Sequence, residues 1–499
     1  MCDVESYIYL PLIEEMGYMP QRRYASGHEI RKYCEKVCAK YGLHDRAVFQ
    51  SRTNSMVWDE DANGWMVEII KKPKGGQEST HRVRADFVMI APGVLSNAKL
   101  PDVEGIESFE GHMFHTARWD YDYTGGSPEQ PDLTGLRGKK VALIGTGATA
   151  VQAVPELAKY AEELTVFQQE RRIPAWVVQR QELNFATFLT DSDDKPAENL
   201  VDDGWTHFPS YSAVVGTPKE VTMENVGERI GTLHAQDYPR QERIRQRTKE
   251  IVKDQNTAEA LQAWYPGWCK RPCFHDHYLQ TFNLPNVKLL NTEGRSIDRV
   301  SESGIKFAGK TYDCDVIIWG TGFRSPVVGS SAGKANISVI GRGGTSMEDL
   351  ATSGDLQTLH GATMRHFPNL FSPGPSQASA TANFTFVLDI LTSHQAYIIV
   401  QALARAGEGK KPVIEPTQEA MDEWSMRILS GAATFAGMAG CTPSYFNKEG
   451  ETDQITEPAQ QMKMARNAIW PKGFPDYCNI IEAWRAEGSM KGLEVSVVG

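Results

Sequence analysis

The sequence predicts an α/β protein with two dinucleotide-binding units of the Rossmann type, and three segments indicate this fold. Residues 86–93 (DFVMIAPG) and 315–322 (DVIIWGTG) each place an acid before an apolar strand that ends at glycine. Either one alone could be an ordinary core strand, but together they suggest two similar units. Between them, residues 139–167 read as strand, glycine turn, helix and strand. This order is a βαβ unit.

The glycine turn of this βαβ unit has the pattern GxGxxA (Gly145, Gly147, Ala150). The first glycine permits a tight turn, the second admits a pyrophosphate, and the small third residue lets helix and strand pack closely. A tight turn in an ordinary sheet protein is the alternative, but the flanking elements favour dinucleotide binding. The candidate contacts are Gly145, Thr146, Gly147, Ala148, Thr149, Ala150, Val151 and Gln152.

The residues after the second strand of the unit bear on which dinucleotide binds. An acid there favours NAD, and an arginine favours NADP. The chain has both, because Gln169 and Glu170 are followed by Arg171 and Arg172. The arginines could hold a 2′-phosphate or be solvated surface charges. A second glycine cluster at 341–344 opens no clear helix, and we interpret it as a loop.

Composition excludes several classes of protein. The chain has 499 residues and a net charge of −11, so we expect two or three domains and no nucleic-acid partner. Its eight cysteines include no CxxC pair. We therefore expect neither a metal site nor a disulfide framework. No uninterrupted apolar run reaches the length of a membrane span, and the start is not a signal peptide. We expect a cytoplasmic protein without stable membrane insertion.

Local patterns predict the remaining elements. Helical periodicity appears at 28–41, and a hairpin is expected around Asn63-Gly64. Polar helices are expected at 241–253 and 257–263, and a long helix at about 385–406.

A dense motif lies about 25 residues before the glycine turn. It comprises Phe109, Gly111, His115, Trp119 and Asp120 in the string FEGHMFHTARWD. The spacing of His115 and Trp119 alone would suit one face of a helix. The string nevertheless resembles the FxGxxxHxxxW(P/D) fingerprint of Baeyer–Villiger monooxygenases, flavoproteins that insert one oxygen of O2 beside a ketone carbonyl.

The resemblance extends over most of the chain and implies two cofactors, FAD and NADP. CDVESYIYLPL at the start is similar to a family stretch beside the flavin, which implies FAD contacts for Asp3, Val4 and Tyr9. WCKRP (268–272) looks like the segment with the catalytic arginine, which makes Arg271 that residue. The expected NADP set is the glycine turn together with Cys2, Gln169, Glu170, Arg171 and Lys270.

The resemblance also implies roles for these residues. Arg271 would stabilise anionic species of the reaction because a guanidinium stays charged, and Asp3 would orient it. The alternative for Arg271 is an ordinary surface arginine before a proline. His115 and Trp119 would tune NADPH positioning and domain motion. The substrates would be O2 and a ketone, and the fungal secondary-metabolite branch suggests a polycyclic or terpenoid one.

The domain organisation follows from the same resemblance. We expect residues 1–108 to begin the FAD domain, 109–136 to be a linker, 137–330 to form the NADP domain with a helical insertion at about 177–268, and 331–499 to complete the FAD domain. No glycine turn precedes the CDVES segment, so we expect an FAD domain that is truncated at its N-terminus. An N- or S-oxygenating flavin monooxygenase and a non-catalytic NADP-binding remnant are the alternatives.

Overall fold

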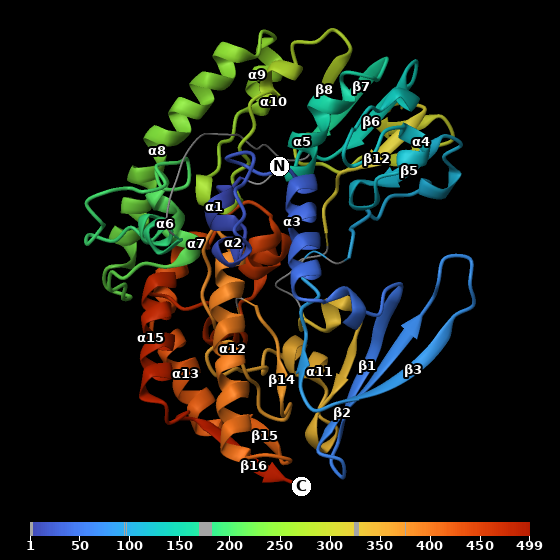
Figure 1. Cartoon of the computed structure of the whole chain (residues 1–499). Coiled ribbons are helices and arrows are strands. Elements are labelled where there is room, and N and C mark those ends of the chain that lie inside the picture. The colour runs from blue at the N-terminus through green and yellow to red at the C-terminus, as the bar shows by residue number, and fades with distance from the viewer. Residues whose placement is uncertain (1–2, 94, 96, 169–181, 324–328, 375) are drawn as a thin grey trace.

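The computed structural model describes residues 3–93, 95, 97–168, 182–323, 329–374 and 376–499. One of its lobes, in teal and yellow-green in Figure 1, is built on a five-stranded parallel sheet of order β5-β12-β6-β7-β8. Its strands are β5 (His112–His115), β6 (Lys140–Ile144), β7 (Glu163–Gln168), β8 (Val287–Asn291) and β12 (Val316–Trp319). All neighbours in this sheet pair in parallel.

This sheet is buried on both faces, which explains its nearly continuous apolar strands. One face packs on α5 (Ala148–Leu157), α9 (Gln255–Leu261) and α10 (Tyr278–Thr281). The other face packs on a small antiparallel sheet. That small sheet consists of β9 (Arg299–Ser301), β10 (Gly304–Phe307) and β11 (Lys310–Asp313).

The second lobe contains three smaller sheets. A four-stranded sheet has the order β13-β1-β2-β3, and two further pairs are β14-β4 and β15-β16. The bounds are β1 (Ser51–Asp59), β2 (Gly64–Lys71), β3 (Ser79–Ala85), β4 (Val88–Met89), β13 (Ser338–Ile340), β14 (Leu370–Phe371), β15 (Lys411–Pro416) and β16 (Leu493–Val498). The predicted hairpin is therefore confirmed, with Asn63 at a φ of 45° in its turn.

Helices surround these sheets and fill the side of the molecule that is green above and orange to red below in Figure 1. The bounds are α1 (Ser6–Tyr9), α2 (Ile13–Met16), α3 (Gly27–Lys40), α4 (Tyr121–Thr124), α6 (Glu182–Leu189), α7 (Ser212–Val215), α8 (Val226–Ile251), α11 (Met347–Ser353), α12 (Phe384–Ala406), α13 (Gln418–Ser430), α14 (Pro458–Arg466) and α15 (Phe474–Glu487). The helices expected at 28–41 and 385–406 are confirmed as α3 and α12. The one expected at 241–253 is the second half of α8, which continues through Pro239.

The two similar segments of the sequence lie in different sheets. β12 is next to β6 in the five-stranded sheet, whereas β4 pairs with β14 in the second lobe. The acids before these strands also have different partners. Asp315 accepts the backbone N–H of Lys140 at 2.7 Å, and Asp86 contacts the ammonium of Lys411 at 2.5 Å. The chain therefore has two separate α/β units, as the pair of segments predicted.

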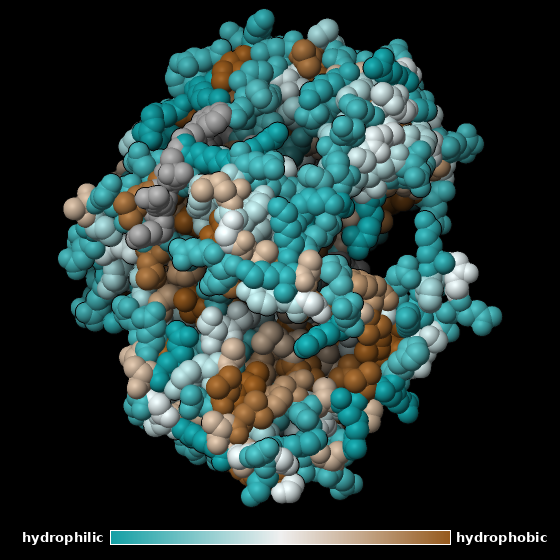
Figure 2. Space-filling model, viewed as in Figure 1, coloured by the Kyte–Doolittle hydropathy of each residue, from teal (hydrophilic) through white to brown (hydrophobic). Residues whose placement is uncertain are grey.

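Helix α12 is long and apolar enough, by length and composition, to cross a membrane, and it is the one such helix in the described part of the chain. It packs on α1, α15, β15 and β16. His394 and Gln395 on this helix are buried in the interior. These contacts are those of a core helix. The surface in Figure 2 is mostly hydrophilic, with apolar side chains gathered on the lower half of that face.

Two buried histidines make the second lobe sensitive to acid. Burial lowers the pKa of His360 to about 3 and lowers the pKa of His394 well below its usual value. Their ring centroids are 5.5 Å apart, and both pack edge-on against Trp484. The histidines of the unfolded chain take up protons near pH 6.5, whereas those of the folded chain do not. The stability that comes from keeping both histidines neutral is therefore fully present above that pH, and it is lost as the pH drops toward 3.

We expect His394→Gln to flatten this pH dependence. Each neutral buried histidine contributes a slope of about 1.4 kcal/mol per pH unit between the two pKa values. The thermal unfolding midpoint, followed by circular dichroism from pH 7.5 to 5, should therefore fall less steeply in the variant than in the parent. His81→Gln, at an exposed position of β3, is the control and should follow the parent. Equal slopes for His394→Gln and the parent would contradict the prediction.

Candidate active site

The glycine turn between β6 and α5 has the geometry of a phosphate cradle. Gly145 has a φ of 108°, and a Cβ on it would lie 2.6 Å from the carbonyl oxygen of Gly320. Gly147 is the N-cap of α5, and no side chain caps that helix start. β6 lies between β7 and β12 in the sheet. Helix α5 connects β6 to β7, and β12 pairs with the other edge of β6. This is the switch point at which open α/β sheets bind nucleotides.

The other turn residues divide into packing and exposed positions. Thr146, Ala150 and Val151 are buried, and the two apolar residues belong to the core beneath α5. Ala148 is half-buried, whereas Thr149 and Gln152 are exposed on the helix start. The small residue expected at 150 therefore packs helix against strand. Cys2, Gln169, Glu170 and Arg171 lie outside the described residues.

The structure brings Asp3 and Arg271 together, although 268 positions separate them. Nη2 of Arg271 donates to Oδ1 of Asp3 at 2.7 Å, and Nη1 donates to the carbonyl oxygen of Ala382 at 3.4 Å. The two side chains are 30% and 21% exposed. The guanidinium is therefore anchored on two sides, while part of it faces open space. This arrangement can stabilise an anion.

A tryptophan that the sequence did not single out completes this pair. The indole N–H of Trp205 donates to the carbonyl oxygen of Asp3 at 3.0 Å. The guanidinium carbon of Arg271 lies 4.8 Å from the centre of the Trp205 rings. Trp205 is fully buried. Nothing in its spacing connects it with residues 3 or 271.

Residues at the start of α12 and just before it hold the backbone of residues 8 and 9. Thr385 donates its hydroxyl to the carbonyl oxygen of Tyr9 at 2.7 Å, and Asn383 donates to that of Ile8. The hydroxyls of Ser379 and Thr381 are buried without a hydrogen-bond partner among the described residues. Buried hydroxyls without a partner are costly, so these two positions are candidates for contact with a polar ligand.

The two remaining residues of the expected flavin side, Val4 and Tyr9, have clear positions. Val4 is fully buried in an apolar cluster that includes Trp205 and Trp268, and Tyr9 packs on its edge. These contacts hold the 3–9 segment in place. The described residues thus bring a partly exposed cation next to the segment that is expected to lie beside the flavin.

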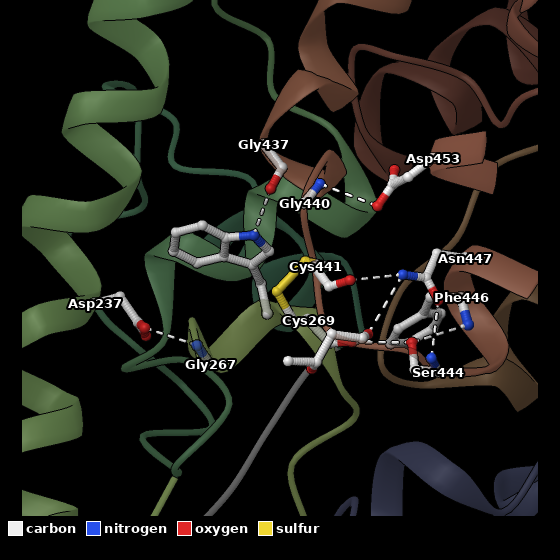
Figure 3. Close-up of a disulfide and its surroundings, with 12 residues drawn as sticks. Asp237, Gly267, Cys269, Gly437, Gly440, Cys441, Ser444, Phe446, Asn447 and Asp453 are labelled. Atoms are coloured by element: carbon white, nitrogen blue, oxygen red, sulfur yellow. Dashed lines mark hydrogen bonds between the residues drawn. A yellow bond between two sulfur atoms is a disulfide. The ribbon is translucent and has the colours of Figure 1, made fainter. Parts of the chain in front are cut away.

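The segment 267–271 is tied to its surroundings by a disulfide. Cys269 is bonded to Cys441, 172 residues away, and not to nearby Cys273 (Figure 3). This single disulfide is not a framework, and the sequence did not predict it, because cysteine spacing does not show which distant residues meet in space. Among the described residues no cluster could hold a metal ion.

Hydrogen bonds reinforce the same connection on both sides (Figure 3). Ser444 donates to the carbonyl oxygen of Cys269 at 3.1 Å, and Trp268 donates to that of Gly437 at 2.9 Å. The backbone N–H of Gly267 donates to Asp237 of α8 at 2.7 Å. Lys270 is buried, with its ammonium 5.1 Å from the ring centre of Tyr265.

The fingerprint forms the edge of the five-stranded sheet and not a helical face. His115 ends β5, a turn follows at Thr116–Arg118, and Trp119 is extended. The helical interpretation of the spacing was therefore wrong. Nδ1 of His115 accepts the N–H of Ala117 at 3.0 Å, and burial lowers the pKa of this imidazole.

The other fingerprint residues fix the strand and the turn after it. Phe109 is buried, and a Cβ on Gly111 would lie 2.5 Å from the carbonyl oxygen of Asp315. Trp119 donates its N–H to Thr124 at 3.0 Å. Asp120 caps α4 and accepts from His112 at 2.9 Å. Each fingerprint position thus has a local structural reason for its residue type.

Comparison with known proteins gives consistent matches. Residues 14–186 match the family described as flavin-binding monooxygenase-like. The chain is 43% identical to the chermesin D/asnovolin J monooxidase of Aspergillus novofumigatus over its whole length and 79% of that relative. It is 42% identical to the polycyclic ketone monooxygenase of Thermothelomyces thermophilus over 99% of this chain and 80% of the relative.

Solved structures agree with these matches. A polycyclic ketone monooxygenase from Thermothelomyces thermophila superposes with a TM-score of 0.92 at 41% identity, covering 99% of this chain and 81% of that one. An oxidised steroid monooxygenase bound to NADP has a TM-score of 0.70 at 25% identity, covering 99% and 90%. The chain therefore belongs to the flavin-binding monooxygenase family and is of the Baeyer–Villiger type that its fingerprint resembles.

Proposed function

We propose that this protein is an FAD- and NADPH-dependent Baeyer–Villiger monooxygenase whose substrate is a polycyclic or terpenoid ketone. The observation that carries the proposal is the partly exposed guanidinium of Arg271, which is anchored by Asp3 at 2.7 Å and by the carbonyl oxygen of Ala382. The overall reaction consumes the ketone, O2, NADPH and a proton. It yields an ester or lactone, NADP+ and water. The name of one relative, the polycyclic ketone monooxygenase of Thermothelomyces thermophilus, supports the ketone class.

The residues of the chain have separate tasks in this proposal. Bound FAD, reduced by NADPH, supplies the activated oxygen. Arg271 stabilises negative charge that develops during insertion, because a guanidinium donates hydrogen bonds and keeps its proton at working pH. Asp3 holds the guanidinium in one orientation at 2.7 Å. The turn at Gly145 and Gly147 holds the NADP pyrophosphate at the start of α5.

Arg271→Ala tests the catalytic assignment. We expect lactone formation from a polycyclic ketone to fall by about 10²-fold or more, because the stabilising cation is lost. Reduction of the flavin by NADPH should change little. Product is measured by gas chromatography, and reduction by stopped-flow absorbance. Arg82→Ala, on exposed β3, is the matched control. Loss of reduction in place of oxygenation would contradict this role for Arg271.

Gly145→Ala tests the dinucleotide turn. A side chain at a φ of 108° and 2.6 Å from Gly320 O strains the turn by about 1–3 kcal/mol. We expect the affinity for NADP+, measured by calorimetry, to weaken by about tenfold, which corresponds to about 1.4 kcal/mol. Gly138→Ala has the same kind of strain at a φ of 70° but no atom within 4 Å. That control should keep its affinity, and equal weakening in both variants would sink the assignment.

Flavin uptake tests whether the polypeptide binds FAD by itself. Asp3, Val4 and Tyr9 are the expected FAD contacts in this chain. We expect FAD to bind, titrated by flavin fluorescence in parallel with the polycyclic ketone monooxygenase of Thermothelomyces thermophilus. Absence of any binding would remove the proposed enzymatic function from this polypeptide.

A further inference from the structure

We propose that Trp205 is a positioning residue that holds Arg271 and Asp3 in their working arrangement. The inference rests on the proposed function and concerns a residue outside the family fingerprint and the glycine turn. One side chain makes two different contacts, one with each member of the ion pair. Losing it would remove one contact from each member of the pair at once.

The contacts of Trp205 are complementary to those of Asp3. The carboxylate of Asp3 fixes Nη2 of Arg271 at 2.7 Å, and this hydrogen bond lies along one edge of the guanidinium. The ring face of Trp205, 4.8 Å from the guanidinium carbon, limits movement of the cation out of its plane. A cation over an indole face is attracted by the ring electrons, and tryptophan is the best residue for this contact.

The second contact reaches the backbone that carries the carboxylate. The indole N–H donates to the carbonyl oxygen of Asp3 at 3.0 Å. Asp3 lies just before α1, a helix of 4 residues whose N-cap has no side-chain hydrogen bond. The segment therefore depends on contacts from elsewhere in the chain, and Trp205 provides one beside Asp3 itself.

Trp205 is itself held rigidly, as a positioning residue must be. Its backbone N–H and that of Thr206 both donate to Oδ1 of Asp203 at 2.9 Å. The rings of Tyr211 and Phe274 meet it edge-on at 5.1 and 5.3 Å. Asp203 and Trp205 are buried. The indole therefore has little freedom to move, and it can hold the guanidinium of Arg271 in one orientation.

A matched control exists in the same molecule. The guanidinium carbon of Arg245 lies 4.7 Å from the ring centre of Trp264, nearly the same distance as in the Arg271 pair. Trp264 is 65% exposed. A substitution there removes an arginine–tryptophan contact of nearly the same distance that does not involve residues 3 or 271.

Nuclear magnetic resonance of arginine side chains tests the arrangement without cofactor or turnover. In the chain labelled with 15N-arginine, the Nε–H signal of Arg271 is identified by its loss in Arg271→Lys. We expect this signal to lie upfield because of the indole ring current, and to move to the position of unstacked arginines in Trp205→Leu. It should stay in place in Trp264→Leu. An unmoved signal in Trp205→Leu overturns the proposal.

Substitution by phenylalanine separates the two contacts of Trp205. It also keeps the proposal testable if Trp205→Leu does not fold. Trp205→Phe keeps an aromatic face but loses the N–H that binds Asp3. We expect a smaller upfield shift of the Arg271 signal than in the parent. If Trp205→Leu lacks the circular dichroism of the parent, Trp205→Phe decides alone, and an unchanged Arg271 signal in it overturns the proposal.

Turnover of the holoenzyme gives a second measurement, the amount of lactone formed per NADPH consumed. This ratio would not change if Trp205 only stabilised the fold. We expect Trp205→Leu to lower the lactone formed per NADPH consumed by about tenfold, since small misplacements of a catalytic group are costly. The oxygen that is not transferred to the ketone should appear as hydrogen peroxide. KM for NADPH should change less than twofold. Trp205→Phe should recover part of the lactone yield. An unchanged yield in Trp205→Leu overturns the proposal. If the parent forms no lactone, the proposed function fails, and the resonance experiment still decides on Trp205.

Discussion

The ion pair between Arg271 and Asp3 is the interaction on which the arrangement of this site depends. A partly buried pair of this kind gives up hydration of both charges, and it is favourable only where further contacts satisfy the remaining hydrogen-bonding positions. Here the carbonyl of Ala382 and the indole of Trp205 supply those contacts. The pair joins the first described residue of the chain to a loop of the helical region. Segments that are far apart in the sequence must therefore pack together before the pair can form.

Several features were readable from the sequence because they have local physical causes. The turn at Gly145 requires a positive φ and close backbone approach, and these requirements leave a glycine signature. The buried strands β6 and β12 are apolar throughout because both faces of their sheet are covered. The hairpin at Asn63 followed from turn chemistry. Such elements depend on neighbours within a few residues.

Other features were not readable because their causes are distant in the chain. The proximity of Asp3 and Arg271 was implied by family resemblance and not by any spacing. Trp205 and the partner of Cys269 had no local signal at all, since each is defined by a contact across more than 150 residues. The fingerprint was identified correctly, but its spacing was compatible with a helix. β5 pairs with β12, which lies far along the chain, and this pairing makes the fingerprint segment a strand.

The disulfide between Cys269 and Cys441 closes a covalent loop of the chain next to the cation. It joins the stretch just before Arg271 to a segment 172 residues further along the chain. Both cysteines lie in the apolar cluster that also contains Val4 and Trp205. One cluster therefore carries the covalent link, the indole that contacts Arg271 and the residue that follows Asp3. Reduction of the disulfide would loosen the support of the cation without removing any group that contacts it.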